Sequence, residues 1–224
     1  KKVLFYNIPA SFDIETTSFK TKDADGEEIK HACMYIWQFG LNGSVIYGRT
    51  WDQFFEFLGI LQEELELSNR HRLIIYVHNL AYEFQFLNKW IEWDKVFALK
   101  QRRPIYAIAG GFEFRCSLIL SNYALAYIGG FDEKTGKPNL LYKYPMKKMV
   151  GDLDYSKHRN SLTPLSSSEL GYCINDVKVV MCYIQQKIEE DGDITKIPLT
   201  NTGYVREYCR EWCFYSDKVL PEDR

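Results

Sequence analysis

Two carboxylates stand two residues apart near the start of the chain. Residues 11–17 read SFDIETT, with Asp13 and Glu15 separated by one apolar residue. Because side chains alternate across a β-strand, a strand here points both acids to the same side. Carboxylates this close repel each other unless a cation lies between them or water solvates them. The pattern therefore indicates a divalent metal site or a solvated strand edge, and alone it leaves both open.

Two further acids and a tyrosine complete a set that could bind metal ions. Glu83 lies in HNLAYEF, at an expected transition from strand to helix, and Tyr172 and Asp176 lie in YCINDV, on one helix face. Individually, such residues are ordinary features of helices. Together with Asp13 and Glu15 they are the set that a two-metal phosphodiester hydrolase requires. Two Mg²⁺ ions about 3.5 to 4 Å apart can align an attacking water with the leaving oxygen, and a tyrosine hydroxyl can orient that water.

The elements that would position these residues can be read from the apolar pattern. In the first half, strands are expected at residues 2–8, 10–17, 33–41, 44–48 and 71–79. A charged loop is expected at 20–31, and Asn42 with Gly43 is a two-residue hairpin signal. A capping box formed by Thr50 and Gln53 predicts the start of a helix. The acidic pair therefore falls in an early strand.

The second half alternates strands with helices and ends in a long helix. Helices are expected at 51–67, at 81–93 and from Ser166 onward, with strands at 95–100, 105–111 and 112–120. Residues 129–150 read as an irregular connection. The last helix repeats apolar residues at Leu170, Ile174, Val177, Met181, Ile184 and Ile188. This order is typical of an α/β layer structure with a mixed central sheet, of which a ribonuclease H-like fold is one member.

Composition limits the classes of protein and partner that fit the chain. With 224 residues, 46% apolar and 16% aromatic, the chain can form one soluble globular domain. A net charge of -2 predicts that any contact with nucleic acid comes from a local patch. Six cysteines without a C-x-x-C pair, and no signal peptide, favour a reduced cytosol. No apolar run reaches about 18 residues, so a membrane span is not expected.

The three acidic segments resemble, in the same order, the three Exo motifs of DEDDy-type proofreading 3'-5' exonucleases. Those motifs read D-x-E, N-x2-3-(F/Y)-D and Y-x3-D. CSLIL at 116–120 resembles the (S/T)-L-x2-h motif of protein-primed family B bacteriophage DNA polymerases, and GDLDY at 151–155 resembles another of their motifs. The resemblance extends from about residue 3 to about residue 206. It implies a ribonuclease H-like fold, with a mixed sheet flanked by helices.

The resemblance also implies a role for each matching residue. The implied ligands of two Mg²⁺ or Mn²⁺ ions are Asp13, Glu15, Glu83 and Asp176. Asp13 would bridge both ions, and Tyr172 would position the nucleophilic water. The positions that hold the 3' end of single-stranded DNA in the family match Thr16, Asn79, Tyr82, Phe86, Ser117 and Leu118. His78, just before Asn79, is expected to reach the same strand.

Two positions depart from the family pattern. Glu83 stands where the second motif usually has an aspartate, which keeps the charge but adds one methylene group. The family's catalytic lysine immediately precedes the glycine of GDLDY, where this chain has Val150. Lys147 and Lys148 lie slightly upstream, and we expect both on the surface. If one of them reached the site, it could stabilise charge on the scissile phosphate.

The activity implied is removal of nucleoside 5'-monophosphates from the 3' end of single-stranded DNA, as in proofreading. The sequence contains neither D-x-x-S-L-Y-P nor Y-x-D-T-D-S, the palm motifs of family B polymerases. We therefore expect an exonuclease domain at 1–206 and a segment at 207–224 that leads toward an absent polymerase domain. The implied partners are that polymerase domain, the DNA 3' end and, through the parent enzyme, a terminal protein primer, with no membrane. The cytoplasm of a bacterial host is the implied location.

Two alternatives remain open at this point. One is a single-strand DNA-binding module of the same fold with weakened or lost nuclease activity, favoured by Glu83 and Val150 and opposed by the other acids. The second is a nuclease that acts on RNA. A tyrosine rather than a histidine in the third motif, and the accessory motifs of phage polymerases, argue against it.

Overall fold

A mixed β-sheet forms the centre of the chain, of which the structure, a computed structural model, describes residues 2–132, 134–151 and 153–215. The strands are β1 (Leu4–Phe5), β2 (Ala10–Lys22), β3 (Glu28–Leu41), β4 (Ser44–Gly48), β5 (His71–Val77), β6 (Lys95–Lys100), β7 (Arg103–Ala109) and β8 (Phe112–Cys116). The helices are α1 (Trp51–Glu64), α2 (Leu80–Leu87), α3 (Ser117–Ser121), α4 (Leu125–Ile128), α5 (Ser167–Asp191) and α6 (Asn201–Tyr215), with a 3-10 turn η1 (Ile194–Lys196).

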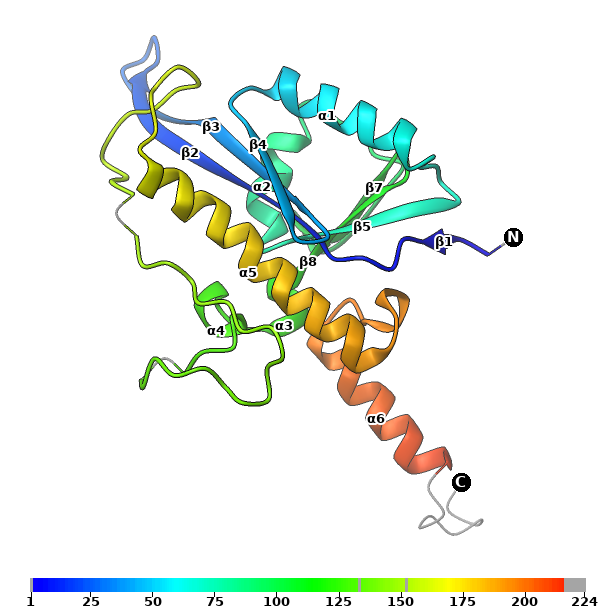
Figure 1. Cartoon of the computed structure of the whole chain (residues 1–224). Helices are drawn as coiled ribbons and strands as arrows, with labels where there is room; N and C mark the ends of the chain where they lie inside the picture. The colour runs from blue at the N-terminus through cyan, green and yellow to red at the C-terminus, as the bar shows by residue number, and fades with distance from the viewer. Residues whose placement is uncertain (1, 133, 152, 216–224) are drawn as a thin grey trace.

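The strands are ordered β4-β3-β2-β5-β8-β7-β6, and β1 pairs with β5 (Figure 1). At the centre β2, β5 and β8 run parallel, whereas β3 and β4 on one side and β7 and β6 on the other run antiparallel to their neighbours. The carboxyl end of β5 therefore lies between β2 and β8. Loops that follow parallel strands at such a position are where α/β sheets place ligands.

Helices cover both faces of this sheet (Figure 1). α1 and α2 close one face over a core that includes Phe12, Ile75 and Phe114, all buried. α5 packs against β2 and β3 on the other face. It approaches closely because Gly40 has no side chain, since a Cβ there would lie 2.6 Å from Val177 Cγ1. The close fit fixes α5 over the strand that carries the two early acids.

The hairpin signal and the start of α1 after Thr50 are confirmed, but the capping box expected from Thr50 and Gln53 is only half formed. Asn42 and Gly43 have φ values of 47° and 92°, as a tight two-residue turn between β3 and β4 requires. The Thr50 hydroxyl accepts from the Gln53 amide, although the Gln53 side chain accepts from the Arg49 amide (2.8 Å) rather than from that of Thr50. Ser166 begins α5 with a full capping box. The apolar repeat of that helix therefore starts where the sequence predicts.

The ends of several strands and helices differ from those predicted. The charged loop at 20–31 is mostly strand, because cross-strand contacts such as the stacked Phe19 and His31 rings (5.1 Å) extend β2 and β3. The strand expected at 112–120 stops at Cys116, opposite the end of β5, and α3 follows. Without a partner strand, the backbone satisfies its own hydrogen bonds as a helix. The strand at 2–8 shortens to β1, and the helix at 81–93 ends at Leu87.

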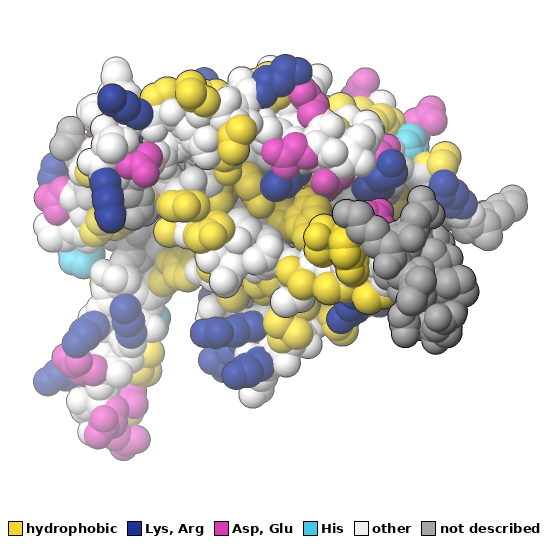
Figure 2. Space-filling model, turned by 90° about the horizontal axis from the view of Figure 1, so that it is seen from below, with side chains coloured by type: hydrophobic (Ala, Val, Ile, Leu, Met, Phe, Trp, Pro, Cys, Tyr) yellow, Lys and Arg dark blue, Asp and Glu magenta, His cyan; other side chains and the backbone are white. Residues whose placement is uncertain are grey.

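The chain after α5 runs into a helix that points away from the sheet (Figure 1). α6 continues through the expected boundary at 206, and residues 216–224 of the predicted terminal segment lie outside the described residues. No helix in the described part of the chain is long and apolar enough to cross a membrane. Charged side chains of both signs are spread over the face seen from below, with apolar ones gathered near its middle (Figure 2).

Candidate active site

Three of the predicted acids converge where β2 passes beneath α5. Carboxylate oxygens of Asp13, Glu15 and Asp176 lie within 4.8 Å of one another. Strand alternation explains the first two, and a bulge between Glu15 and Thr16 shifts the register in which β2 pairs with β3. Bulges of this kind re-aim neighbouring side chains beside functional sites. The strand and helix that the sequence predicts are therefore the ones that build the cluster.

The fourth acid, Glu83, reaches the same cluster from α2. The left-handed φ of Asn79 (76°) turns the chain sharply from β5 into this helix. Glu83 is only 3% exposed, and its carboxyl group shares a hydrogen bond with Asp13. Glu83 therefore interacts with Asp13 at the edge of the cluster, although it is not among the three acids whose oxygens lie within 4.8 Å of one another.

Burial and mutual repulsion raise the pKa values of these acids. Burial, followed by the charge of Asp176, raises the pKa of Asp13 to about 7. Burial and then the charge of Asp13 raise the pKa of Glu15 to about 8, and the same two causes raise the pKa of Glu83 well above its usual range. Without a cation, the cluster therefore holds protons at neutral pH.

A tyrosine and a lysine complete the edge of the cluster. Lys148 Nζ donates to Tyr172 Oη (3.0 Å) and to Asp176 Oδ2 (3.1 Å). Its ammonium also lies 4.5 Å from the centre of the Tyr172 ring. The ring packs against the main chain at Gly151, where a Cβ would lie 2.5 Å from Tyr172 Cε2. Residue 151 must therefore be small if the tyrosine is to keep this place.

The prediction that Lys147 and Lys148 both lie on the surface was correct for Lys147 and wrong for Lys148. Lys147 is exposed, as expected, and Val150 is 95% exposed. Lys148 instead reaches the acids, because the irregular connection passes over the amino-terminal part of α5. Sequence reasoning had no periodicity in this connection from which to orient the side chain. Asp152, the acid of the GDLDY motif, lies outside the described residues.

Two other side chains near the cluster were not predicted. Tyr155 Oη lies 3.4 Å from Tyr172 Oη, so that two phenols stand beside the acids. Arg159 is 4% exposed, forms an ion pair with Glu169 (2.6 Å) and lowers the Glu15 pKa through its charge. Tyr155 ends the GDLDY motif, but the sequence indicates no role for its side chain, and Arg159 belongs to no motif identified in the sequence.

The residues expected to hold DNA lie around α2 and α3. The hydroxyls of Thr16 and Tyr82 are in hydrogen-bond contact, and the rings of Tyr82 and Phe86 are 5.3 Å apart. His78 Nδ1 lies 3.1 Å from the hydroxyl of Ser117. The remaining two, Asn79 and Leu118, line a cavity together with Tyr82. Burial lowers the pKa of His78 to about 4, so that its imidazole is neutral at pH 7.

The donor set fits a hard divalent cation. All four acids offer oxygen ligands, which Mg²⁺ and Mn²⁺ prefer. Among the described residues, Glu83 Oε2 is buried without a hydrogen-bond partner. An oxygen left in this state costs about 1–3 kcal/mol unless another group binds it. A cation held by Asp13, Glu15 and Asp176, close to Glu83, would remove both this cost and the repulsion.

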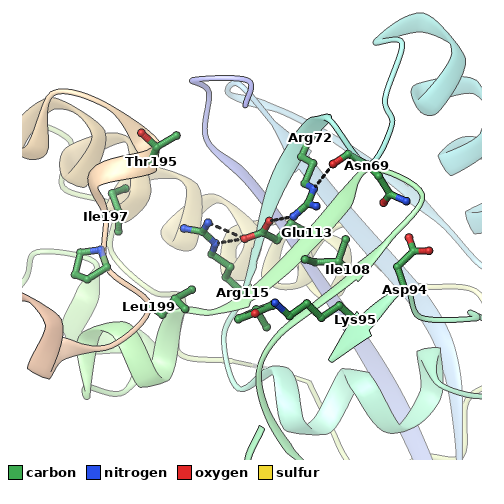
Figure 3. Close-up of a pocket in the computed structure, with 12 residues that line it drawn as sticks. Asn69, Arg72, Asp94, Lys95, Ile108, Glu113, Arg115, Thr195, Ile197 and Leu199 are labelled. Carbon is green, nitrogen blue, oxygen red and sulfur yellow. Dashed lines mark hydrogen bonds and ion pairs between the residues drawn. The ribbon is translucent and has the colours of Figure 1, made fainter. Parts of the chain in front are cut away.

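A separate cavity of about 720 Å³ shares no residue with the acidic cluster. Its lining includes the acid Glu113, which forms ion pairs with Arg72 (3.0 Å) and Arg115 (2.7 Å), as Figure 3 shows. Because both oxygens of Glu113 already bind guanidinium groups, this carboxylate is not free to ligate a metal ion. The candidate site is therefore the acidic cluster.

Similarity to known proteins is found at the level of the fold. No protein-family model and no curated protein matches the sequence. An orthorhombic crystal form of phi29 DNA polymerase is similar with a TM-score of 0.62 and 15% identity, over 89% of this chain and 33% of that one. Its complex with primer-template DNA and incoming nucleotides gives 0.63 and 13%, over 92% and 35%. The chain spans about a third of that polymerase, and the expected ribonuclease H-like fold is confirmed.

Proposed function

We propose that this chain is a two-metal 3'-5' exonuclease domain that acts on the 3' end of single-stranded DNA. The observation that carries the proposal is the convergence of four carboxylates, a tyrosine and a lysine at one place in a ribonuclease H-like fold. The acids come from three separate elements, β2, α2 and α5. A site with buried groups whose pKa values are this strongly perturbed is typical of catalysis rather than of a structural ion pair.

The carboxylates would hold two Mg²⁺ or Mn²⁺ ions, with Asp13 in contact with both. Such ions, when bound, activate water and stabilise charge on phosphoryl oxygens. The protein supplies the placement of the surrounding groups. Burial raises the pKa of Tyr172, so its phenol stays neutral. Because the Tyr172 oxygen accepts from Lys148, the phenol proton is free to donate to a water or a phosphate oxygen beside the acids.

The Lys148 ammonium would also stabilise negative charge on the scissile phosphate. It is the basic group that contacts Tyr172 and Asp176, and it is about one fifth exposed (21%). A cation at this distance from the acids balances part of their charge when a phosphate enters. Preorganised cations of this kind stabilise the charge that develops in the transition state. Lys148 therefore takes the place that the family gives to a lysine nearer the glycine.

The strand itself would lie over α2 and α3. Tyr82 is 37% exposed, and its ring beside Phe86 offers a surface on which a base can stack. Thr16 and Ser117 offer hydroxyls, and Asn79 offers an amide that does not cap α2. A mismatched 3' end frays more readily and so reaches such a site more often. This gives the domain a proofreading role.

The proposal extends to a longer parent protein. The partners would be a polymerase domain of the parent chain and, through it, a terminal protein primer. The parent enzyme would be a protein-primed DNA-directed DNA polymerase acting in the cytoplasm of a phage-infected bacterium. The similarity to about a third of phi29 DNA polymerase supports this extension.

A cleavage assay tests the nuclease directly. The full chain is incubated with 5'-labelled single-stranded DNA and Mn²⁺ or Mg²⁺, beside an Asp13→Ala/Glu15→Ala variant. We expect stepwise shortening from the 3' end that the variant and EDTA both abolish. Tight binding without shortening would instead identify the single-strand binding module, and faster cleavage of RNA would reassign the substrate.

A further inference from the structure

The tip of the β6–β7 hairpin carries three positive charges. Lys100 ends β6, Arg103 begins β7, and Gln101 with Arg102 forms the turn between them. All four side chains are exposed. Together they line part of a cavity of about 480 Å³.

The three cations have no protein partner. Within the part of the chain that the structure describes, Lys100, Arg102 and Arg103 form no ion pair or side-chain hydrogen bond. Some exposed cations, such as Lys20, are paired with glutamates, whereas others, such as Lys22, have no such partner among the described residues, so what sets the tip apart is the clustering of its charges. Three adjacent like charges repel one another, so their accumulation at one turn indicates an anionic ligand rather than internal stabilisation.

The backbone conformation of the turn is a second indication of a ligand. Arg102 has a φ of 62°, in the left-handed region that Gly, Asn or Asp adopt with less strain. An arginine there costs stability that an asparagine would not. Strain of this kind is commonly retained at ligand-binding sites. The side chain at this position therefore serves something other than the turn itself.

The same cavity is lined by residues of the proposed DNA site. These are Asn79, Tyr82 and Leu118, and the apolar side chains of Leu99 and Ile119 contribute to the lining as well. The cavity thus combines an apolar floor, an aromatic ring and a cationic rim. Single-stranded nucleic acid is bound by this combination, with bases on the apolar surface and phosphates on the cations.

We propose that Lys100, Arg102 and Arg103 form a phosphate-binding rim that holds the single strand upstream of its 3' end. The inference rests on the proposed exonuclease, because it takes the 3' end to lie at the acidic cluster. A chain with a net charge of -2 and four clustered acids needs local positive charge to attract DNA. The rim supplies it on the strand's path, beside the cavity rather than at the reacting phosphate. Strands long enough to span both places would be bound and cut better than very short ones.

The test compares a rim variant with a matched control. The rim variant is Lys100→Gln/Arg102→Asn/Arg103→Gln, in which asparagine also suits the left-handed turn. The control is Lys2→Gln/Lys22→Gln/Lys30→Gln, which also removes three positive charges, at exposed lysines that do not line the cavity. Cleavage of oligothymidylates of about three and about twelve nucleotides is measured with Mn²⁺. Binding is measured by fluorescence anisotropy in an Asp13→Ala/Glu15→Ala background, with increasing salt.

Each phosphate contact contributes about 0.7 to the logarithmic salt slope, so three contacts give about 2, or an about 20-fold loss of affinity between roughly 50 and 200 mM salt. We expect the rim variant to lose this part of the slope and to raise KM for the longer strand. Its kcat, its cleavage of the trinucleotide and its fold, measured by circular dichroism, should match the control. An unchanged slope and KM would overturn the rim, even if cleavage persists. Binding that depends on the rim without any cleavage would overturn the exonuclease and keep the rim.

Discussion

An Asp13→Asn variant should be more stable than the wild type when divalent cations are absent. Asparagine keeps the size of the side chain and can still share a hydrogen bond with Glu83, but it carries no charge into the cluster. Burial and the charge of Asp176 raise the Asp13 pKa from 3.8 to about 7. Above about pH 4 the unfolded chain ionises this carboxyl group at no cost, whereas the folded protein ionises it only against burial and repulsion. The negative charge of Asp13 therefore lowers the free energy of unfolding.

The size of the stability difference follows from the shift in the Asp13 pKa. At about 1.4 kcal/mol per unit, a rise of roughly three units corresponds to about 4 kcal/mol at pH 8 and to about 2 kcal/mol at pH 5. Stability of the metal-free wild type thus falls as pH rises between these values. In a domain of this size about 4 kcal/mol corresponds to roughly 10 °C in Tm. Metal removal should expose this penalty in the wild type and not in the variant.

The assay is thermal unfolding followed by circular dichroism in EDTA at pH 5 and at pH 8. The matched control is Asp25→Asn, an exposed carboxylate in the turn between β2 and β3. We expect the Asp13 variant to melt above the wild type at both values, by a larger margin at pH 8, and the control to melt with the wild type. A variant that melts at or below the wild type at pH 8 would refute the argument that repulsion and burial dominate at this site.

Four other outcomes are expected. Mg²⁺ or Mn²⁺ should raise the Tm of the wild type more at pH 8 than at pH 6, because the carboxyl groups must release protons to bind them; equal shifts would contradict this. Lys148→Met should lower kcat about 100-fold with little change in KM, measured on single-stranded DNA, whereas a pure loss of binding would show in KM. Gly151→Ala should displace the Tyr172 ring and reduce cleavage while circular dichroism shows the fold retained; full activity would mean that the ring is not needed there. Glu83→Asp should cleave more slowly, because the shorter side chain falls short of Asp13, and a faster rate would show that the glutamate is a handicap.

Much of the site was predictable because two regular patterns encode it. Alternation places Asp13 and Glu15 on one side of β2, and the apolar repeat of α5 places Asp176 over that strand. The sequence predicts Glu83 as an acid at the start of a helix. It does not predict the interaction with Asp13, because one methylene group determines whether the carboxyl group reaches that residue. Lys148 lies in a connection without periodicity, so only the folded chain shows where its ammonium lies.

The fold was predictable wherever a segment depends mainly on its own sequence. The Asn42-Gly43 turn and the start of α5 at Ser166 follow from local chemistry. The end of β8 does not, because Cys116 is the last residue with a partner strand, and that depends on where β5 stops. The long β2–β3 hairpin was missed for a similar reason, since its charged residues are held by pairing across the strands rather than by an apolar pattern.

The contact between β2 and α5 would set when the proposed nuclease activity can appear. Ser11 Oγ donates to the Val177 carbonyl (2.8 Å) across 166 residues of chain, next to the point where Asp13 and Asp176 meet. Closing a loop of this length is slow compared with forming a hairpin or a helix. A nascent or partly folded chain therefore holds only a fraction of its acids together. DNA cleavage would begin only after α5 has docked on β2. An incompletely folded chain would then not degrade the DNA around it.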